Sequence, residues 1–266
     1  MSDTLSDVFA RTRAEGRAAL IGYLPAGFPT PGACVELISA MVDSGVDIIE
    51  VGLPYSDPLM DGPDIQAAVE RALRGGTTPD VVLDTVMRVS AAGATAVVMS
   101  YWNPIERYGV ARFAERLAGA GGHGVITPDL TPEEAGPWIE ATTGAGLDRI
   151  FLVAPSSTDE RIARVASVTS GFLYAASTMG VTGARSQVSS AAPELVRRAR
   201  ALTDLPIAVG LGVSTGDQAR EVAAYADGVI VGSAFVRGIL RATDQRAAVA
   251  SVRDLSGDLA RGVRRI

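Results

Sequence analysis

Short apolar runs alternate with longer amphipathic stretches along this chain of 266 residues. The runs are continuously apolar, a pattern typical of strands that are covered on both faces of a sheet. The longer stretches carry apolar residues at helical spacing, which predicts helices between the strands. The eight predicted strands are residues 19–24, 47–51, 96–100, 124–126, 149–153, 171–175, 206–210 and 228–231.

A short helix over residues 3–15 is predicted before the first strand. The later helices are predicted over residues 31–44, 64–74, 80–91, 110–119, 132–143, 159–167, 192–202, 215–224, 234–241 and 245–261. Repeated strand–helix units in a chain of this length predict an α/β fold, a single (β/α)₈ TIM barrel with an extra N-terminal helix and additional helices. We expect residues 1–266 to form one domain. The alternative is an open doubly wound sheet, but no Gly-x-Gly-x-x-Gly turn follows the first strand.

Composition excludes several kinds of chemistry. All 24 basic residues are arginine, so no lysine side chain can form a Schiff base with a substrate carbonyl or with pyridoxal phosphate. The single histidine, His123, argues against a His-rich metal site and against a Ser-His-Asp triad. His123 precedes the fourth strand, at the N-terminal face of a barrel, and we interpret it as structural. We therefore expect no metal, and chemistry carried by carboxylates, hydroxyls, arginine and backbone groups.

Charge and hydropathy limit the partners and the compartment. The net charge is −6 and the arginines are scattered, which argues against a nucleic-acid partner. No apolar stretch approaches the roughly 18 residues of a membrane span, so we expect no membrane partner. The acidic start lacks the pattern of a signal peptide, and the single Cys34 cannot form an internal disulfide. These features predict a cytoplasmic protein.

The clearest chemical signal lies in the segment Ile48–Pro63. Glu50 lies on a predicted buried strand, where a carboxylate is costly unless it is paired or used. Asp61 follows in the loop before the next helix. Because the loops after the strands form the mouth of a barrel, Asp61 could face Glu50 across a pocket, and we predict that these two acids are the chemical pair. The alternative is that Asp61 caps the helix that begins after Gly62.

Glycine and serine are frequent in the last loops at the same end of the barrel. Gly212 follows the seventh strand, and Gly232 and Ser233 follow the eighth, where barrels commonly bind phosphate. Gly183 lies in the loop after the sixth strand. Glycines let the backbone approach an anion, and helix N-terminal N–H groups point toward it, so we predict a phosphate site here. Ordinary strand-to-helix turns are the alternative. The loop 180–185 could close as a lid.

Large apolar side chains are predicted at the ends of the earlier strands. They could form a slot for a flat ring, although capping of the barrel core explains the pattern equally well. The residues concerned are Tyr23, Met99, Tyr101, Ile126 and Val153.

A family resemblance emerges from these motifs. The segment Glu50–Pro63, which reads Glu-Val-Gly-Leu-Pro-Tyr-Ser-Asp-Pro-Leu-Met-Asp-Gly-Pro, resembles the signature of the tryptophan synthase alpha subunit. Residues 101–105, 129–130, 180–183 and 232–233 match that family in the same order, so the resemblance covers nearly the whole chain. It implies retro-aldol cleavage of indole-3-glycerol phosphate to indole and D-glyceraldehyde 3-phosphate.

The resemblance also implies partners and residue roles. The indole would pass to a beta subunit for L-tryptophan synthesis, in an alpha2-beta2 complex whose pyridoxal phosphate belongs to the beta partner, with no cofactor in this chain. Tyr23 stands where phenylalanine is common in some members. The roles implied are catalysis for Glu50 and Asp61, phosphate binding for Gly212, Gly232 and Ser233, and strand-six and lid positions for Tyr174, Thr182 and Gly183.

Bond cleavage in this reaction needs an electron sink, and without lysine the indole ring itself must serve. We hypothesise that Glu50 protonates the ring carbon that bears the chain and removes a proton from the chain hydroxyl. Desolvation should raise the pKa of Glu50, which keeps that proton available. We hypothesise that Asp61 stays ionised and accepts a hydrogen bond from the ring N–H.

Three other functions fit parts of the same sequence. They are a stand-alone indole-3-glycerol phosphate lyase, a non-catalytic subunit that activates a beta chain, and another phosphosugar barrel such as an isomerase or epimerase. The intact acid pair argues against a non-catalytic subunit. His123 alone is poor material for the base or metal site of the third.

Overall fold

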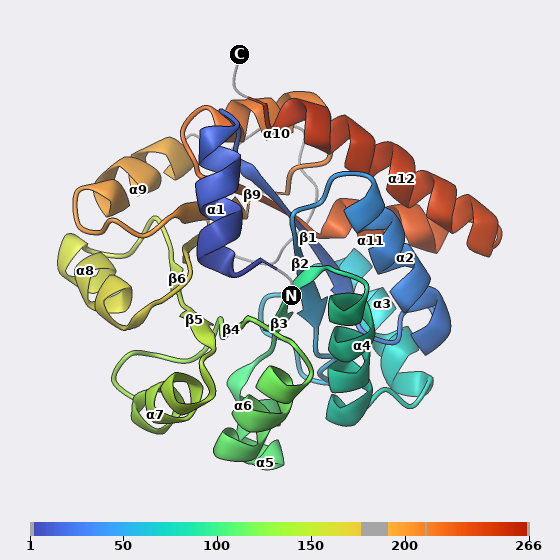
Figure 1. Ribbon diagram of the computed structural model, residues 1–266, viewed down its shortest axis with the longest axis horizontal. Coiled ribbons are helices and arrows are strands. Elements are labelled where there is room, and N and C mark those ends of the chain that lie inside the picture. The colour runs from blue at the N-terminus through green and yellow to red at the C-terminus, as the bar shows by residue number, and fades with distance from the viewer. Residues whose placement is uncertain (1–2, 177–190, 211, 265–266) are drawn as a thin grey trace.

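The computed structural model describes residues 3–176, 191–210 and 212–264. The described residues form one sheet of parallel strands in the order β5-β4-β3-β2-β1-β9-β8-β7-β6, which curls into a barrel inside a ring of helices (Figure 1). The strands are β1 (Ala19–Pro25), β2 (Ile48–Gly52), β3 (Thr95–Met99), β4 (Gly124–Ile126), β5 (Asp148–Ile150), β6 (Leu152–Val153), β7 (Leu173–Ala176), β8 (Ile207–Gly210) and β9 (Gly228–Val231). The predicted TIM barrel is confirmed.

The fifth predicted strand closes the barrel as two short pieces. It breaks at Phe151, so that β5 pairs with β4 and β6 pairs with β7. The Phe151 carbonyl accepts a hydrogen bond from the Tyr174 N–H at 3.1 Å, and the Ile150 carbonyl accepts one from the Thr127 N–H at 3.2 Å. One continuous stretch of chain therefore pairs with β4 through its first half and with β7 through its second half, so the sheet has no long unpaired edge strand.

Helices cover the outer face of the sheet, and one more lies across the end of the barrel (Figure 1). They are α1 (Leu5–Ala14), α2 (Pro31–Asp43), α3 (Pro63–Arg74), α4 (Pro79–Ala91), α5 (Trp102–Tyr108), α6 (Val110–Gly119), α7 (Gly136–Ala145), α8 (Asp159–Val168), α9 (Ala191–Arg200), α10 (Gly216–Ala223), α11 (Ser233–Arg241) and α12 (Gln245–Gly262). No described helix is long and apolar enough to cross a membrane.

Two helix predictions were wrong. The loop predicted after β3 contains α5, whose Pro104 lies in the first turn, where a missing N–H breaks no helical hydrogen bond. The free N–H of Trp102 in that turn donates to the Asp129 carboxylate at 2.9 and 3.1 Å, a contact from a distant loop. The helix predicted from residue 132 instead begins at Gly136, because the residues before it form turns.

Two apolar clusters show how the strands are used. One fills the barrel interior, and a larger one lies between the sheet and the helices. Within β2, Ile48 belongs to the inner cluster and Ile49 to the outer one, as the alternation of side chains along a strand requires. The described residues of the inner cluster are Leu5, Val8, Phe9, Ala19, Ile21, Ile48, Val97, Ile126, Ile150, Phe172, Ala208 and Ile230.

Helix α1 plugs the N-terminal end of the barrel. Its Leu5, Val8 and Phe9 are buried in the inner cluster, and the Phe9 and Phe172 rings lie 5.6 Å apart. The burial of these three side chains holds a helix that lies outside the strand–helix repeat against the barrel.

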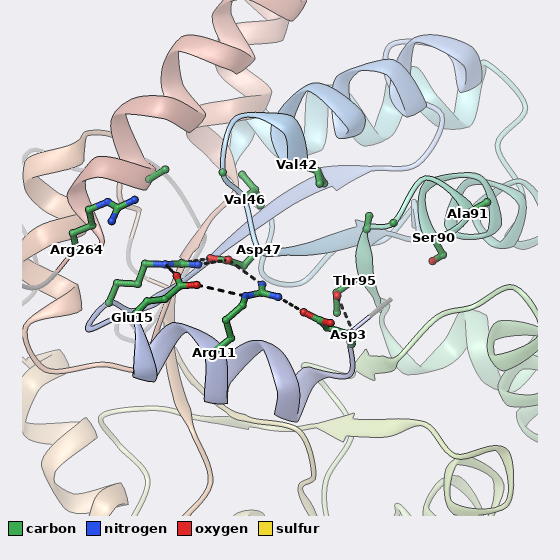
Figure 2. Close-up of a pocket in the computed structure, with 15 residues that line it drawn as sticks. Asp3, Arg11, Glu15, Val42, Val46, Asp47, Ser90, Ala91, Thr95 and Arg264 are labelled. Carbon is green, nitrogen blue, oxygen red and sulfur yellow. Dashed lines mark hydrogen bonds and ion pairs between the residues drawn. The ribbon is translucent and has the colours of Figure 1, made fainter. Parts of the chain in front are cut away.

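Ion pairs surround this plug. Arg17 donates two hydrogen bonds to Asp47, at 2.6 and 2.8 Å, and their side chains are 12% and 7% exposed. Asp47 also accepts the Leu20 N–H at 2.8 Å. Arg11 approaches the same carboxylate at 3.5 Å from α1, as Figure 2 shows beside Glu15. These groups line a pocket of about 720 Å³ at the end of the barrel where the strands begin.

Candidate active site

Glu50 points into the barrel near the opposite, C-terminal end of the strands. It lies two residues beyond Ile48 of the inner cluster, and its register partners are Tyr23 on β1 and Val97 on β3. The residue is 1% exposed, and its Oε1 atom has no hydrogen-bond partner among the described residues. Burial raises the pKa of Glu50 to about 8, so the carboxyl group carries a proton near neutral pH.

Asp61 is held in the loop between β2 and α3 by Tyr101. The Tyr101 hydroxyl donates to Asp61 Oδ1 at 3.1 Å and accepts the Met60 N–H at 2.9 Å. Burial raises the pKa of Asp61, and the hydrogen bond from Tyr101 lowers it. Gly62 occupies the N-cap of α3, with no side-chain cap. The alternative that Asp61 caps this helix is therefore wrong.

Tyr23 shows that the two acids share one region of the barrel. Burial raises the pKa of Tyr23 well above 10.0, and the charges of Asp61 and then Glu50 raise it further. The charge of Glu50, after burial, also raises the pKa of Tyr174 on β7. Carboxyl groups from β2 and from its following loop therefore face the same cluster of phenols. We call Glu50 and Asp61 the acid pair.

Two glycines leave room for these phenols. A Cβ atom at Gly52 would lie 2.5 Å from the Tyr23 hydroxyl oxygen, and one at Gly210 would overlap the Tyr174 hydroxyl. A Cβ at Gly232 would lie 3.3 Å from Cδ1 of Tyr23. The Tyr23 ring therefore spans from Gly52, beside the acid pair, to Gly232, at the start of α11.

The predicted phosphate residues lie in neighbouring loops. Gly212 follows β8 with a φ of 71°, a conformation that favours glycine. Gly232 is the N-cap of α11 and Ser233 its first residue, 7% exposed. Since β8 and β9 are parallel neighbours, both loops leave the same edge of the sheet. Helix N-terminal N–H groups at such a place are suited to an anion. Gly183 lies outside the described residues.

Three of the predicted ring residues pack with the cluster inside the barrel. Met99, Ile126 and Tyr174 pack with the inner cluster. Val153 does not, because it alternates with Leu152, which packs against that cluster, while Val153 is buried in the outer one. The prediction for Val153 is therefore wrong, and Leu152 takes its place. Side chains two residues apart on a strand point to the same face, so Ile150 on the inner face predicts Leu152 there as well. Thr182 lies outside the described residues.

The described residues contain no group of three or more His, Cys, Asp and Glu side chains placed to hold a metal ion. The arrangement that they do contain is a protonated carboxyl group and a second acid beside apolar and phenol side chains of the barrel, with the glycine turns after β8 and β9 at the same face. Such a site can move a proton on a substrate with an apolar part and an anionic part.

Comparison with known proteins identifies the family. The model of the tryptophan synthase alpha chain family matches residues 9–264. The chain belongs to this family. It is 60% identical to the tryptophan synthase alpha chain of Thermobifida fusca over 258 residues, covering 96% of each chain.

Solved structures of tryptophan synthase chains have the same fold as this chain. A chain of Mycobacterium tuberculosis tryptophan synthase is similar with a TM-score of 0.93 and 56% identity, covering 100% of both chains. The alpha subunit from Legionella pneumophila has a TM-score of 0.88 at 33% identity, covering 98% of both. The alpha subunit of tryptophan synthase is a lyase that cleaves indole-3-glycerol phosphate, and the resemblance seen in the sequence is confirmed.

Proposed function

We propose that this chain cleaves indole-3-glycerol phosphate by using Glu50 as a general acid and base and Asp61 as the partner of the indole N–H. The observation that carries this proposal is the buried Glu50, whose Oε1 atom has no hydrogen-bond partner among the described residues and whose pKa is raised to about 8. A buried carboxyl group without a hydrogen-bond partner does not stabilise the fold, but a protonated one can transfer its proton to a substrate.

The proton would move in two steps. Protonated Glu50 gives its proton to the ring carbon that bears the glycerol chain, and the ring nitrogen becomes cationic. The resulting carboxylate then removes the proton from the hydroxyl group on the adjacent chain carbon. The electron pair of the breaking carbon–carbon bond returns to the ring and neutralises the nitrogen. Indole and D-glyceraldehyde 3-phosphate form, and Glu50 is protonated again.

Asp61 would stabilise the cationic ring. An ionised carboxylate that accepts the ring N–H gains interaction energy as positive charge develops there, which lowers the barrier. The Tyr101 hydroxyl bonds Asp61 Oδ1 at 3.1 Å, which fixes the direction of the carboxylate and opposes the effect of burial on its pKa. Burial raises the pKa of both acids, but only Asp61 accepts a hydrogen bond that opposes this effect.

The phosphate would bind at the glycine turns after β8 and β9. Gly212, Gly232 and Ser233 supply backbone and hydroxyl donors from adjacent loops, and we propose that Gly183 and Thr182 complete the site from the lid. Neutral donors at a helix N-terminus suffice for a phosphate without lysine.

We also propose a beta subunit as partner, in an alpha2-beta2 complex in the cytoplasm, with pyridoxal phosphate in the beta subunit and no cofactor in this chain. The loop Tyr55–Met60 lies at the barrel mouth and carries Leu59, which is 73% exposed. Burying this side chain against a partner would remove its apolar surface from water. The tilted contact of the Tyr55 and Tyr101 rings, with ring centroids 5.5 Å apart, links the loop to Asp61, which accepts a hydrogen bond from Tyr101.

A turnover assay tests this function. The purified chain is given indole-3-glycerol phosphate with and without a beta subunit, and indole and triose phosphate are measured in equal amounts. We expect turnover that increases with the beta subunit, because docking would order the loop next to Asp61. Turnover indifferent to saturating beta subunit would indicate a stand-alone lyase. The absence of any turnover, with a gain in beta activity, would indicate a non-catalytic activating subunit.

A further inference from the structure

The Tyr23 phenol lies beside Glu50 in the barrel. Tyr23 is 8% exposed, and its register partner across the β1–β2 ladder is Glu50. The Oε1 atom of Glu50 is buried and has no hydrogen-bond partner among the described residues. Buried polar groups are almost always hydrogen-bonded, so Glu50 calls for a ligand group at this place, and the neighbouring phenol can reach the same group.

The position of the Tyr23 ring indicates which part of a bound substrate its hydroxyl can contact. The hydroxyl end of the Tyr23 ring lies over Gly52, beside the acid pair, and the Cβ end lies against Gly232, at the phosphate loops. A substrate that stretches from the acid pair to these loops must pass along this ring. The group that reaches the hydroxyl end is the start of the glycerol chain, where it joins the indole.

We propose that the Tyr23 hydroxyl donates a hydrogen bond to the substrate hydroxyl on the chain carbon attached to the indole ring. This inference rests on the proposed function. Glu50 removes the proton from that same oxygen, and a second donor on it holds the hydroxyl toward Glu50 and stabilises the negative charge that develops as its proton leaves. Tyr23 is therefore a catalytic residue that distinguishes a hydroxylated chain from a plain one.

The phenol is suited to act as a donor. Burial, Asp61 and Glu50 all raise the pKa of Tyr23, so it keeps its proton near neutral pH. The close approach to Gly52 fixes the ring, so the direction of the hydroxyl is set before substrate binds.

Tyr23→Phe tests this contact because it removes one oxygen atom and keeps the ring. The kcat and KM of cleavage are measured, together with the Kd of an analogue that has the indole, a three-carbon chain without hydroxyl groups, and the phosphate. We expect kcat/KM to fall about 3- to 12-fold, as for loss of one neutral hydrogen bond, and the Kd of the analogue to change less than about twofold.

Tyr225→Phe is the matched control. The Tyr225 hydroxyl is buried and has no hydrogen-bond partner in the described part of the chain, and it precedes β9 at the N-terminal end of the barrel, away from Glu50. This variant should match the native chain in both measurements, and thermal unfolding should show that both variants are folded.

Two results with Tyr23→Phe would overturn the inference while leaving the proposed function intact. One is a kcat/KM within twofold of the native value, and the other is an equal loss for substrate and analogue, which would mean that the ring acts by packing. A native chain that fails to cleave the substrate, alone and with the beta subunit, would overturn the proposed function and this inference with it.

Discussion

One largely buried carboxyl group lies just before strand β2 and another lies within the strand, and their surroundings differ. Asp47, just before the strand, accepts two hydrogen bonds from Arg17 and one from the Leu20 N–H. Glu50, three residues later, faces the other end of the barrel with Oε1 unbonded to any described residue. The carboxylate of Asp47 has its hydrogen bonds within the protein and contributes to stability. The Oε1 atom of Glu50 has none from the described residues, so Glu50 can bond a substrate and exchange a proton with it.

The same contrast extends to the surroundings of each acid. At the N-terminal end, Arg11, Arg17 and Glu15 form ion pairs around the helix that plugs the barrel (Figure 2). At the C-terminal end, Glu50 faces the phenols of Tyr23 and Tyr174, and no described cation contributes to its pKa. One end of the barrel therefore holds α1 in place, while the other keeps an acid protonated.

The largest effect expected from breaking this contrast is on catalysis. Glu50→Gln keeps the shape of a neutral buried acid but cannot transfer the proton, so we expect kcat to fall at least about 100-fold with substrate affinity largely retained. Steady-state kinetics and ligand binding measure both. Asp57→Asn, in the exposed part of the loop that follows β2, is the control and should stay near the native rate. A Glu50→Gln enzyme with a tenth of native activity would remove Glu50 from the mechanism.

The corresponding change at the other end should affect stability instead. Asp47→Asn leaves Arg17 without its charge partner in a site where both side chains are largely buried, so we expect the free energy of unfolding to fall by about 3 kcal/mol. Denaturant unfolding measures this, and kcat should not change. The control is Asp217→Asn in the exposed ion pair with Arg220, which should cost less than about 0.5 kcal/mol. Equal losses in the two variants would contradict the special role of Asp47.

The smallest effect is a pH dependence of stability that belongs to Glu50. Burial raises its pKa from 4.5 to about 8, so between these values the folded chain holds a proton that the unfolded chain has released. The free energy of unfolding therefore falls as pH rises, by roughly 2 kcal/mol between pH 5 and pH 7 from this group. Glu50→Gln has no such proton, so its stability relative to the native chain should increase over that interval. A difference that is constant with pH would show that Glu50 is ionised when folded.

The alternating pattern of the chain predicted the barrel because strands covered on both sides must be apolar throughout. It also located Glu50 correctly inside the barrel, since an acid in such a run is conspicuous. The prediction for Val153 was wrong because it considered only that this residue ends a strand. The alternation of side chains along the strand directs Leu152, and not Val153, into the barrel. The pattern also failed for α5, whose first turn is completed by Asp129 from another loop.

The sequence by itself determined the strand–helix order, the family, and the residue types that chemistry could use. The tertiary structure alone decided which acids are paired. Asp47 and Arg17 lie 30 residues apart, and whether they meet depends on how α1, β1 and β2 come together. The placement of the Tyr23 ring beside Glu50 likewise depends on Gly52 and Gly232, which leave room for the ring and come from other parts of the chain. A pattern along one chain records which residues are buried, but the partners of a buried polar group come from distant segments that meet only when the barrel closes.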